Sequence, residues 1–358
     1  MDRLQSKITF TRYNDAGVVI SNIVMDFVND IMIDTSFETL TDKARITIPR
    51  NLTFNGKAIA TETDSVFNRG DSVKIEAGYF PNIRRVFTGY ITKPHSQTPI
   101  VLDCEDEMFQ LKQKTFTFPL EYTTITKDKN GGLLKTPKKS YREIDLDELI
   151  DAIKTAVDVD LTVKNIAKVE SLGHIRFSDV TPAQALEYLQ DNYGIYSYFV
   201  YDEDNDEQIL NIGLASDASD TNNVPFVFEE RIIKENMEYV KSEEMNLKIV
   251  CISFNSQTNE KSRKQAGASD GETRTFHYLN LTADECQAHA DNMLTEWRYD
   301  GYRGDFETFG EPYIRHGDVA ELTSLQYPEK DGNYQVVSVE RKFGMGGYRQ
   351  IIELGRKI

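Results

Sequence analysis

Apolar and polar residues alternate in short runs through the first 120 residues of the chain. The runs include MDFVNDIMI, ARITIP, SVKIEAGYF, RVFTGYIT and PIVLDCED, and turn residues separate them. Alternation with a period of two is typical of strands that bury one face. Because no helical pattern interrupts it, residues 1–120 predict a mostly antiparallel sheet or barrel of about six to eight strands.

Helical periodicity first appears in the middle of the chain. The segment DLDELIDAIKTAVDVD places Leu146, Leu149, Ile150, Ile153 and Val157 on one helical face. Asp145 and Glu148 stand at the spacing of an N-cap and a capping box.

A second helix is predicted between residues 181 and 194, and start and stop residues mark both of its ends. Thr181 is placed as N-cap, Pro182 as the first helical residue, Gln184 as the partner in a capping box and Gly194 as the stop. Two strands, IYSYFVY and QILNIGL, then follow, joined by the acidic connection DEDNDE.

The last third of the chain returns to strands. VFEERII, YVKSEEM and LKIVCISFN come first, and GDFETF, GDVAELTS, NYQVVSVERKF and YRQIIELG close the chain. Between them, residues 255–272 are polar and poor in apolar side chains, which predicts a long mobile loop. Thr282 and Glu285 have the spacing of a capping box, so a helix is expected over residues 283–299.

Residues 126–142 lack any sustained period. They contain Gly131, Gly132 and Pro137 together with several basic side chains, and we interpret them as a solvated loop or linker. The whole pattern predicts an α+β fold that is predominantly β. Its domains are a first β domain (1–120), a mixed middle domain (121–225) and a second β domain (226–358).

A weak internal repeat relates the two β domains. RGDSVKIEAG near residue 69 is followed by FTGYIT, and RHGDVAELTS near residue 315 is followed by NYQVVSVE. In each case a Gly-Asp turn precedes an alternating strand, because glycine accepts a positive φ and aspartate bonds the neighbouring backbone. Two related barrels are therefore expected.

The excess of acidic side chains argues against one class of function, the binding of nucleic acid. The 358 residues carry 58 acidic and 41 basic side chains, a net charge of −17, which disfavours stable binding to nucleic-acid phosphates. The acidity fits either simple solubility or a channel through which DNA slides without sticking. No apolar run has the roughly 20 residues of a membrane span, and the N-terminus lacks the apolar core of a signal peptide. Assembly in the bacterial cytoplasm is expected.

Motifs of catalytic or metal chemistry are missing from the sequence. The three cysteines, Cys104, Cys251 and Cys286, are odd in number and fit reduced thiols in strands and a helix. Asp202, Asp204 and Asp206 have part of the spacing of a calcium loop, but Glu207 and Gly213 stand where glycine and glutamate are needed. No catalytic, cofactor-binding or metal-binding residue is therefore assigned, and no cofactor is expected.

The five histidines are scattered, and none has a metal-ligand spacing; they are His95, His174, His277, His289 and His316. The tripeptide Arg69-Gly70-Asp71 is interpreted as a strand start rather than an adhesion motif.

The sequence resembles the late-control protein D family, the hub proteins of contractile phage tails, which are related to the N-terminal part of type VI secretion spike proteins. The resemblance rests on DTSFETLTDKARITIPRN, RGDSVKIEAGY with VFTGYITK, IVLDCEDEMFQLKQKTF, HIRFSDVTPAQALEYLQDNYGIYSYFV, GDFETFGEPYIRHGDVAEL and GNYQVVSVERKF. Together these segments cover most of the chain in the family's order.

The resemblance implies two tail-tube-like β-barrel domains per chain and a homotrimer with a pseudo-sixfold ring. Such a baseplate hub would connect the hexameric tail tube to a separate trimeric spike protein, contact other baseplate proteins and line the channel for DNA. A separate spike is implied because the chain ends at Ile358, soon after the second barrel. The expected location is the tail of a virion or an equivalent contractile injection particle.

The sequence also leaves other functions open. One is a tail adaptor of a non-contractile phage, which would share the barrels. Another is an all-β glycan hydrolase or glycan-binding protein, since a catalytic pair of carboxylates is defined by spatial separation and not by sequence. Exposed strand edges and the segments 126–142 and 255–272 are the expected contacts with tube or spike.

Overall fold

The structure is a computed structural model of the chain. It describes residues 3–14, 16–49, 53–54, 57–58, 66–95, 98–119, 123–127, 133–137, 144–157, 160–167, 172, 175–213, 222–255 and 260–358. Within these ranges the chain divides into two compact units. One comprises residues 1–110, 196–245 and 299–358, and the other residues 111–195 and 246–298. The second unit is thus built from two insertions into the first.

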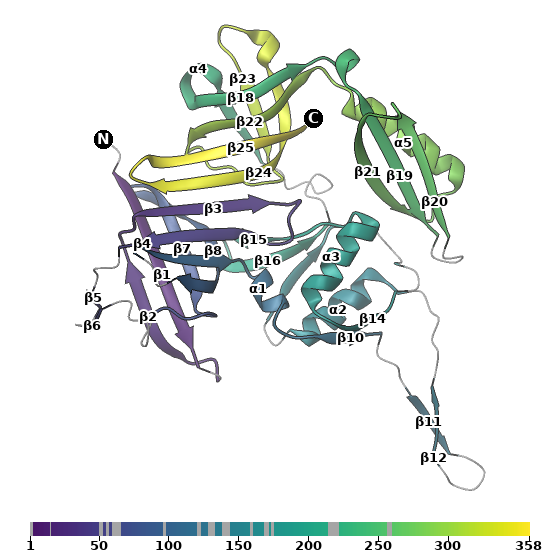
Figure 1. The fold of residues 1–358 in the computed structure, drawn as a ribbon, viewed down its shortest axis with the longest axis horizontal. Coiled ribbons are helices and arrows are strands. Elements are labelled where there is room, and N and C mark those ends of the chain that lie inside the picture. The colour runs from purple at the N-terminus through teal and green to yellow at the C-terminus, as the bar shows by residue number, and fades with distance from the viewer. Residues whose placement is uncertain are drawn as a thin grey trace. The chain divides into compact units, whose positions relative to one another are not determined.

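Seven strands form the first strand module of the first unit (Figure 1). They are β1 (Leu4–Tyr13), β2 (Val19–Met25), β3 (Asp30–Ser36), β4 (Lys43–Ile48), β7 (Ser72–Tyr79), β8 (Asn82–His95) and β9 (Ile100–Glu105). Their order in the sheet is β3-β4-β9-β8-β7-β1-β2, and all neighbours are antiparallel. The alternating side chains fill one core, in which Ile8, Ile46, Ile75, Ile91 and Leu102 have no exposed surface. The short β5 (Thr53–Phe54) and β6 (Lys57–Ala58) pair with each other.

Six strands form the second strand module. They are β17 (Asn223–Val227), β18 (Ile232–Val240), β22 (Gly301–Phe309), β23 (Val319–Thr323), β24 (Gly332–Gly344) and β25 (Gly347–Lys357). The order is β18-β22-β25-β24, with β23 also on β24 and β17 parallel to β23. A separate core surrounds Phe226, Phe306, Val336 and Ile352. The predicted α+β, predominantly β class is confirmed.

Smaller elements complete the first unit. The predicted strands after Gly194 are the hairpin of β15 (Ser197–Asp202) and β16 (Glu207–Ile212). The expected strand VFEERII is interrupted, because α4 (Phe228–Arg231) separates β17 from β18. Short helical turns also occur at α1 (Met108–Leu111), η2 (Ser242–Glu244) and η3 (Pro328–Lys330).

The first insertion of the second unit contains both helices predicted for the middle of the chain. They are α2 (Leu146–Ala156) and α3 (Pro182–Tyr193), and the strands are β10 (Phe116–Phe118), β11 (Thr123–Lys127), β12 (Leu133–Pro137), β13 (Thr162–Asn165) and β14 (Phe177–Val180). Thr181 and Gln184 form the predicted capping box, and Gly194 ends α3 at φ 65°. Asp145 occupies the N-cap of α2, but its side chain makes no capping hydrogen bond, so the box predicted with Glu148 is wrong.

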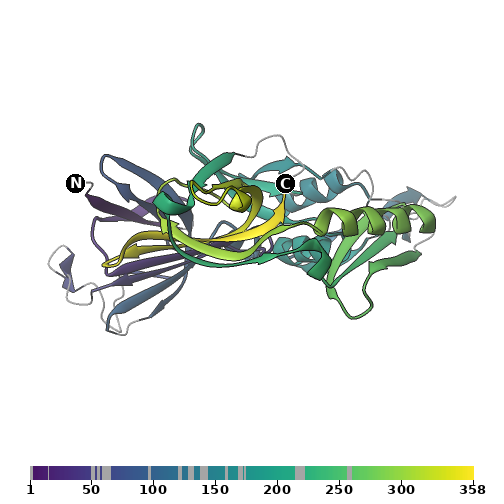
Figure 2. The ribbon, with the colours of Figure 1, turned by 90° about the horizontal axis from the view of Figure 1, so that it is seen from above.

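The second insertion is a three-stranded sheet with one helix across it (Figure 1, Figure 2). Its elements are β19 (Leu247–Phe254), β20 (Lys261–Gly267), β21 (Glu272–Leu279) and α5 (Ala283–Trp297). The predicted capping box of Thr282 and Glu285 begins α5.

Both predicted loops are wrong in part. Residues 261–267 form β20, which pairs along its whole length with β19. Only Ala266 of this strand is buried, and its sequence therefore lacks the apolar alternation by which a strand is predicted. Residues 123–127 and 133–137 form the hairpin β11–β12. In the sequence, Asn-Gly-Gly stands between them, which is a typical hairpin signal. The rest of 126–142 and residues 256–259 lie outside the described residues. The division into domains at 1–120, 121–225 and 226–358 stays a prediction.

Gly89 tests the packing inside the first strand module. A Cβ atom there would lie 2.0 Å from the carbonyl oxygen of Glu105 and 2.8 Å from the Cα of Asp106, both backbone atoms. Gly89→Ala should therefore lower the free energy of unfolding by about 3 kcal/mol or more, measured by chemical denaturation.

The control is Gly346→Ala, because a Cβ at Gly346 meets nothing within 4 Å. Equal stabilities of the two variants would contradict this packing.

Candidate functional site at the junction of the strand modules

The two strand modules share one strand order. In chain order β3, β4, β7, β8 and β9 of the first module correspond to β18, β22, β23, β24 and β25 of the second, and each set has the same neighbours. The outermost strands differ, because β1 pairs with β7 antiparallel whereas β17 pairs with β23 in parallel. The internal repeat predicted from sequence is therefore present in five strands of each module.

The Gly-Asp turns of the repeat make the same hydrogen bonds. Gly70 N–H donates to Ile91 O at 2.8 Å and Gly317 N–H to Val336 O at 2.7 Å. The return bonds to Asp71 O and Asp318 O are both 2.9 Å. In each turn the aspartate carboxylate also accepts the backbone N–H three residues before it, at 2.9 Å.

A β-bulge recurs at the same place. Between β8 and β9 the register skips Thr92, which lies between the pairs Ile91–Cys104 and Lys93–Asp103. Between β24 and β25 it skips Val337, which lies between Val336–Leu354 and Ser338–Glu353. These matching irregularities fix the correspondence of the strands residue by residue, so that Lys93 is the counterpart of Ser338.

The modules are joined by β3 and β24. These strands pair antiparallel from Ser36–Ser338 to Asp30–Gly344, which makes one sheet of both modules (Figure 1). Side chains reinforce the ladder, since the Thr35 hydroxyl donates to Val339 O at 3.1 Å and the Ser36 hydroxyl to Val337 O at 3.2 Å.

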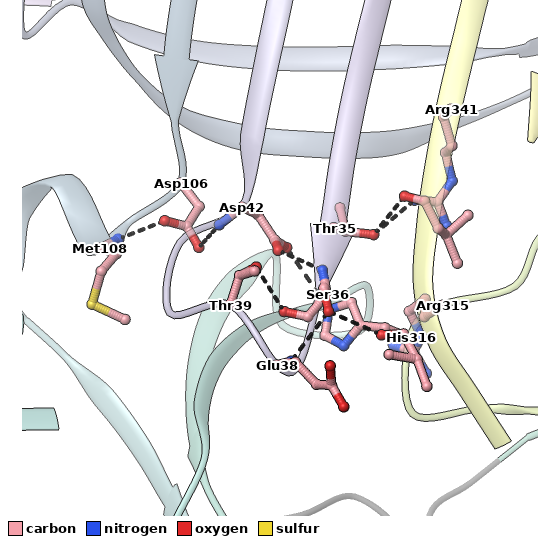
Figure 3. Close-up of polar contacts among 12 residues, drawn as sticks. Thr35, Ser36, Glu38, Thr39, Asp42, Asp106, Met108, Arg315, His316 and Arg341 are labelled. Carbon is pink, nitrogen blue, oxygen red and sulfur yellow. Dashed lines mark hydrogen bonds and ion pairs between the residues drawn. The ribbon is translucent and has the colours of Figure 1, made fainter. Parts of the chain in front are cut away.

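A cluster of buried polar groups holds the end of β3 (Figure 3). Ser36 N–H donates to Asp42 Oδ1 at 3.0 Å, Asp42 N–H to Asp106 Oδ2 at 3.2 Å, and Met108 N–H to Asp106 Oδ1 at 3.0 Å. Asp42 and Asp106 are 9% and 5% exposed. Burial, together with the negative charge of Asp42, raises the pKa of Asp106 well above its usual value.

The second strand module contributes a histidine and an arginine to this cluster. His316 Nε2 lies 3.7 Å from Asp42 Oδ2, and the His316 ring packs edge-on against Tyr198 at 5.1 Å. Arg341, which is 2% exposed, donates to the Thr35 hydroxyl and to Ile314 O, and its guanidinium lies over the Tyr313 ring. The cluster therefore connects the β3–β4 turn with the Gly-Asp turn of the other module.

The burial of Asp42 and Asp106 bears on the alternative of glycan hydrolysis. A pair of carboxyl groups with one raised pKa is what glycan hydrolysis would need. Here both groups are buried and accept backbone N–H bonds, so a sugar could not reach them without rearrangement of the turn.

The other residues weighed from sequence have partners of their own. Asp71 is 5% exposed and pairs with Arg12 at 2.8 Å, so the Arg-Gly-Asp tripeptide is not available for adhesion. Asp202 accepts Asp204 N–H, and Asp206 pairs with Arg85.

Among the described residues, no group of three or more His, Cys, Asp or Glu side chains is arranged to hold a metal ion. The histidines are separated, and His174 lies outside the described residues. None of the helices in the described ranges combines the length and apolarity needed to cross a bilayer.

One surface was missed by the sequence analysis. The hairpin of β1 and β2 exposes Val18, Val19, Ile20 and Val24, each more than half exposed. Between the two strands, Asn14 Oδ1 accepts the N–H groups of Ala16 and Val18. The available signal was an apolar run, VVI, in which neighbouring residues of a strand cannot all face the core.

Solved structures of other proteins have a similar fold. No protein-family model and no curated protein sequence matches the chain. Among solved structures it is similar to a tail protein from Neisseria meningitidis, with 13% identity, a TM-score of 0.58 and coverage of 99% of this chain and 96% of that one. It is also similar to the 43 kDa tail protein of prophage MuSo2 from Shewanella oneidensis, with 13% identity, a TM-score of 0.56 and 98% of both chains covered.

A third similar structure is a Francisella PdpA–VgrG complex, at 10% identity and a TM-score of 0.54. The match covers 99% of this chain and 58% of that one. The chain therefore has the fold of phage tail proteins over its whole length. The resemblance to tail hub and spike proteins that the sequence predicted is confirmed for the fold.

The raised pKa of Asp106 gives a pH-dependent stability. Because the native state holds this proton more tightly than the unfolded chain, where an aspartate has a pKa of about 3.9, ionisation lowers stability as pH rises above that value. Asp106→Asn cannot ionise. The stability advantage of the wild type over this variant should therefore shrink as the pH rises above about 4, the range in which the unfolded chain has already lost this proton.

Urea denaturation of both proteins across this range measures the difference. Asp204→Asn, an exposed carboxylate exchanged in the same way, is the control. A constant gap between wild type and Asp106→Asn would show that Asp106 ionises normally.

Proposed function

We propose that this chain is a non-enzymatic structural hub protein in the baseplate of a phage tail or a related contractile injection machine. The observation that carries the proposal is the match of the fold over nearly the full length of two phage tail proteins. The burial of the Asp42–Asp106 pair argues against the rival proposal of glycan hydrolysis at that site.

In this proposal three copies form a closed ring. Each chain contributes two modules of equivalent strand order, so a trimer presents six similar positions. Such a ring could meet a hexameric tail tube on one side and a separate trimeric spike on the other, with further baseplate proteins around it. The net charge of −17 suits a channel that DNA passes without being held.

The free strand edges support a particular contact between chains. β3 is covered by β24, but its counterpart β18 pairs only with β22 among the described strands. In β24 the segment that covers β3 begins at Ser338, whose counterpart in β8 is Lys93. The corresponding segment of β8 is therefore Lys93–His95. It pairs with β9 on one side, while the pairing of β7 ends at Tyr90. We infer that β18 of one copy lies along this segment of the next, because unpaired edges favour strand addition.

The correspondence also gives the register of this contact. Ser36 pairs with Ser338 and Asp34 with Glu340 inside the chain. The equivalent pairs between chains are Val240 with Lys93 and Glu238 with His95. Glu238 and Lys93 are both exposed, and they would be diagonal neighbours of opposite charge.

This contact would be weaker than the junction inside the chain. The receiving segment is three residues long in β8 but seven in β24. Pro94 within it has no N–H group to donate to the ladder. Assembly between copies would therefore depend on protein concentration, whereas β3–β24 forms within each chain.

Shape and mass of the purified protein test the proposal. Light scattering should give three times the mass of 41.0 kDa, and negative-stain microscopy should give a threefold ring with a central opening. A ring that forms only when the spike protein is added would also fit. A monomer that stays a monomer with both spike and tube proteins would overturn the hub assignment.

Charge reversal tests the contact itself. Glu238→Lys would face Lys93 with like charge, which should weaken trimer formation at least about tenfold. Combining it with Lys93→Glu should restore the trimer, since the pair is then reversed. Sedimentation of the single and double variants over a concentration range measures this.

Glu203→Lys, in the exposed turn between β15 and β16, is the matched control and should assemble normally. A stable trimer that is indifferent to both single reversals would place the contact elsewhere while leaving the hub function intact.

A further inference from the structure

Two cysteines that are 35 positions apart in sequence meet in the second insertion. Cys251 lies on β19, the central strand between β20 and β21, and Cys286 lies in the first turns of α5. Neither has exposed surface, and both belong to the core that α5 forms with its sheet. The helix thus presents one thiol directly to the other.

The two sulfur atoms are 2.8 Å apart. Cys286 Sγ also lies 3.3 Å from the carbonyl oxygen of Cys251, so its position is set by the strand backbone as well as by the other thiol. A disulfide bond is about 2.05 Å long, and its formation therefore needs a shift of under about 1 Å. By contrast Cys104 is buried in β9 of the first unit, where its Sγ lies 3.9 Å from Leu102 O.

We propose that Cys251 and Cys286 are a site of reversible disulfide formation, which joins α5 to β19 when the protein meets a disulfide oxidant such as oxidised glutathione. One cysteine thiolate attacks a sulfur of glutathione disulfide, forms a mixed disulfide and releases one glutathione. The second thiolate then attacks the protein sulfur of this mixed disulfide and releases the other glutathione. The two cysteines lose two protons and two electrons, and one glutathione disulfide becomes two glutathione thiols.

Burial controls when this reaction occurs. Burial and the contact with Cys286 raise the pKa of the Cys251 thiol, so the reactive thiolate is scarce in the closed core. An oxidant reaches the pair only when the start of α5 separates from the sheet. The thiols would thus remain reduced in a glutathione-reducing cytoplasm and oxidise slowly in an oxidising medium.

The disulfide would constrain the part of the second insertion that lies between Cys251 and Cys286. The chain between the two cysteines contains β20 and β21, so the disulfide closes a loop around the whole sheet of the insertion. Closing such a loop restricts the unfolded chain more than the folded one and therefore stabilises the insertion. This effect is independent of whether the protein is a baseplate hub.

Thiol counting tests the proposal on the full chain. The protein is incubated with oxidised glutathione, unfolded in the presence of N-ethylmaleimide and weighed intact, with a dithiothreitol-reduced sample beside it. The reduced chain should take up three labels and the oxidised chain one, on Cys104, with a Cys251–Cys286 peptide pair in the digest. The oxidised chain should also melt at a higher temperature than the reduced one.

Two variants check the assignment. Cys286→Ser should lose the oxidation-dependent rise in melting temperature, and Cys104→Ser should keep it. Because wild-type protein is compared with itself in two redox states, the test stands even if Cys286→Ser folds poorly. Three labels after prolonged oxidation, or a disulfide that involves Cys104, would overturn the proposal.

Discussion

The pairing of β3 with β24 is the contact on which the rest of the first unit depends. Without a partner, the edge strand of each module would present a row of unpaired backbone groups, and an exposed row of this kind is both unstable and prone to unwanted pairing. Joining β3 to β24 satisfies one such row inside the chain. The buried Asp42, Asp106 and Arg341 side chains then keep the end of β3 in the orientation that this ladder requires.

The repeat is conserved in backbone geometry more than in side chains. Both Gly-Asp turns exchange the same pair of hydrogen bonds with the second following strand, and both modules bulge one residue beyond that point. The residues that pack around these features differ, since Ile91 in one module stands where Val336 stands in the other. Because the backbone is shared and the side chains differ, the equivalent edge strands β3 and β18 can form contacts of unequal strength.

Local patterns in the sequence predicted the fold class, most strands and the clearest helices. Capping boxes at Thr181 and Thr282 were readable because each motif is contained within four residues. β20 was not readable, because its partner β19 and the helix that covers it determine its conformation, and its own side chains are mostly polar. The Asp42–Asp106 pair and the two facing thiols depend on segments far apart in sequence, so no motif could have indicated them.

The placement of the second insertion has a consequence for how such a chain can change. Residues 246–298 enter between β18 and β22, which is the position that the short turn between β3 and β4 occupies in the other module. The same corner of the sheet therefore tolerates either a tight turn or an entire folded segment. A segment inserted at the β3–β4 corner, however, would compete with the hydrogen bonds of Asp42 and Asp106 that hold the end of β3 against the second strand module.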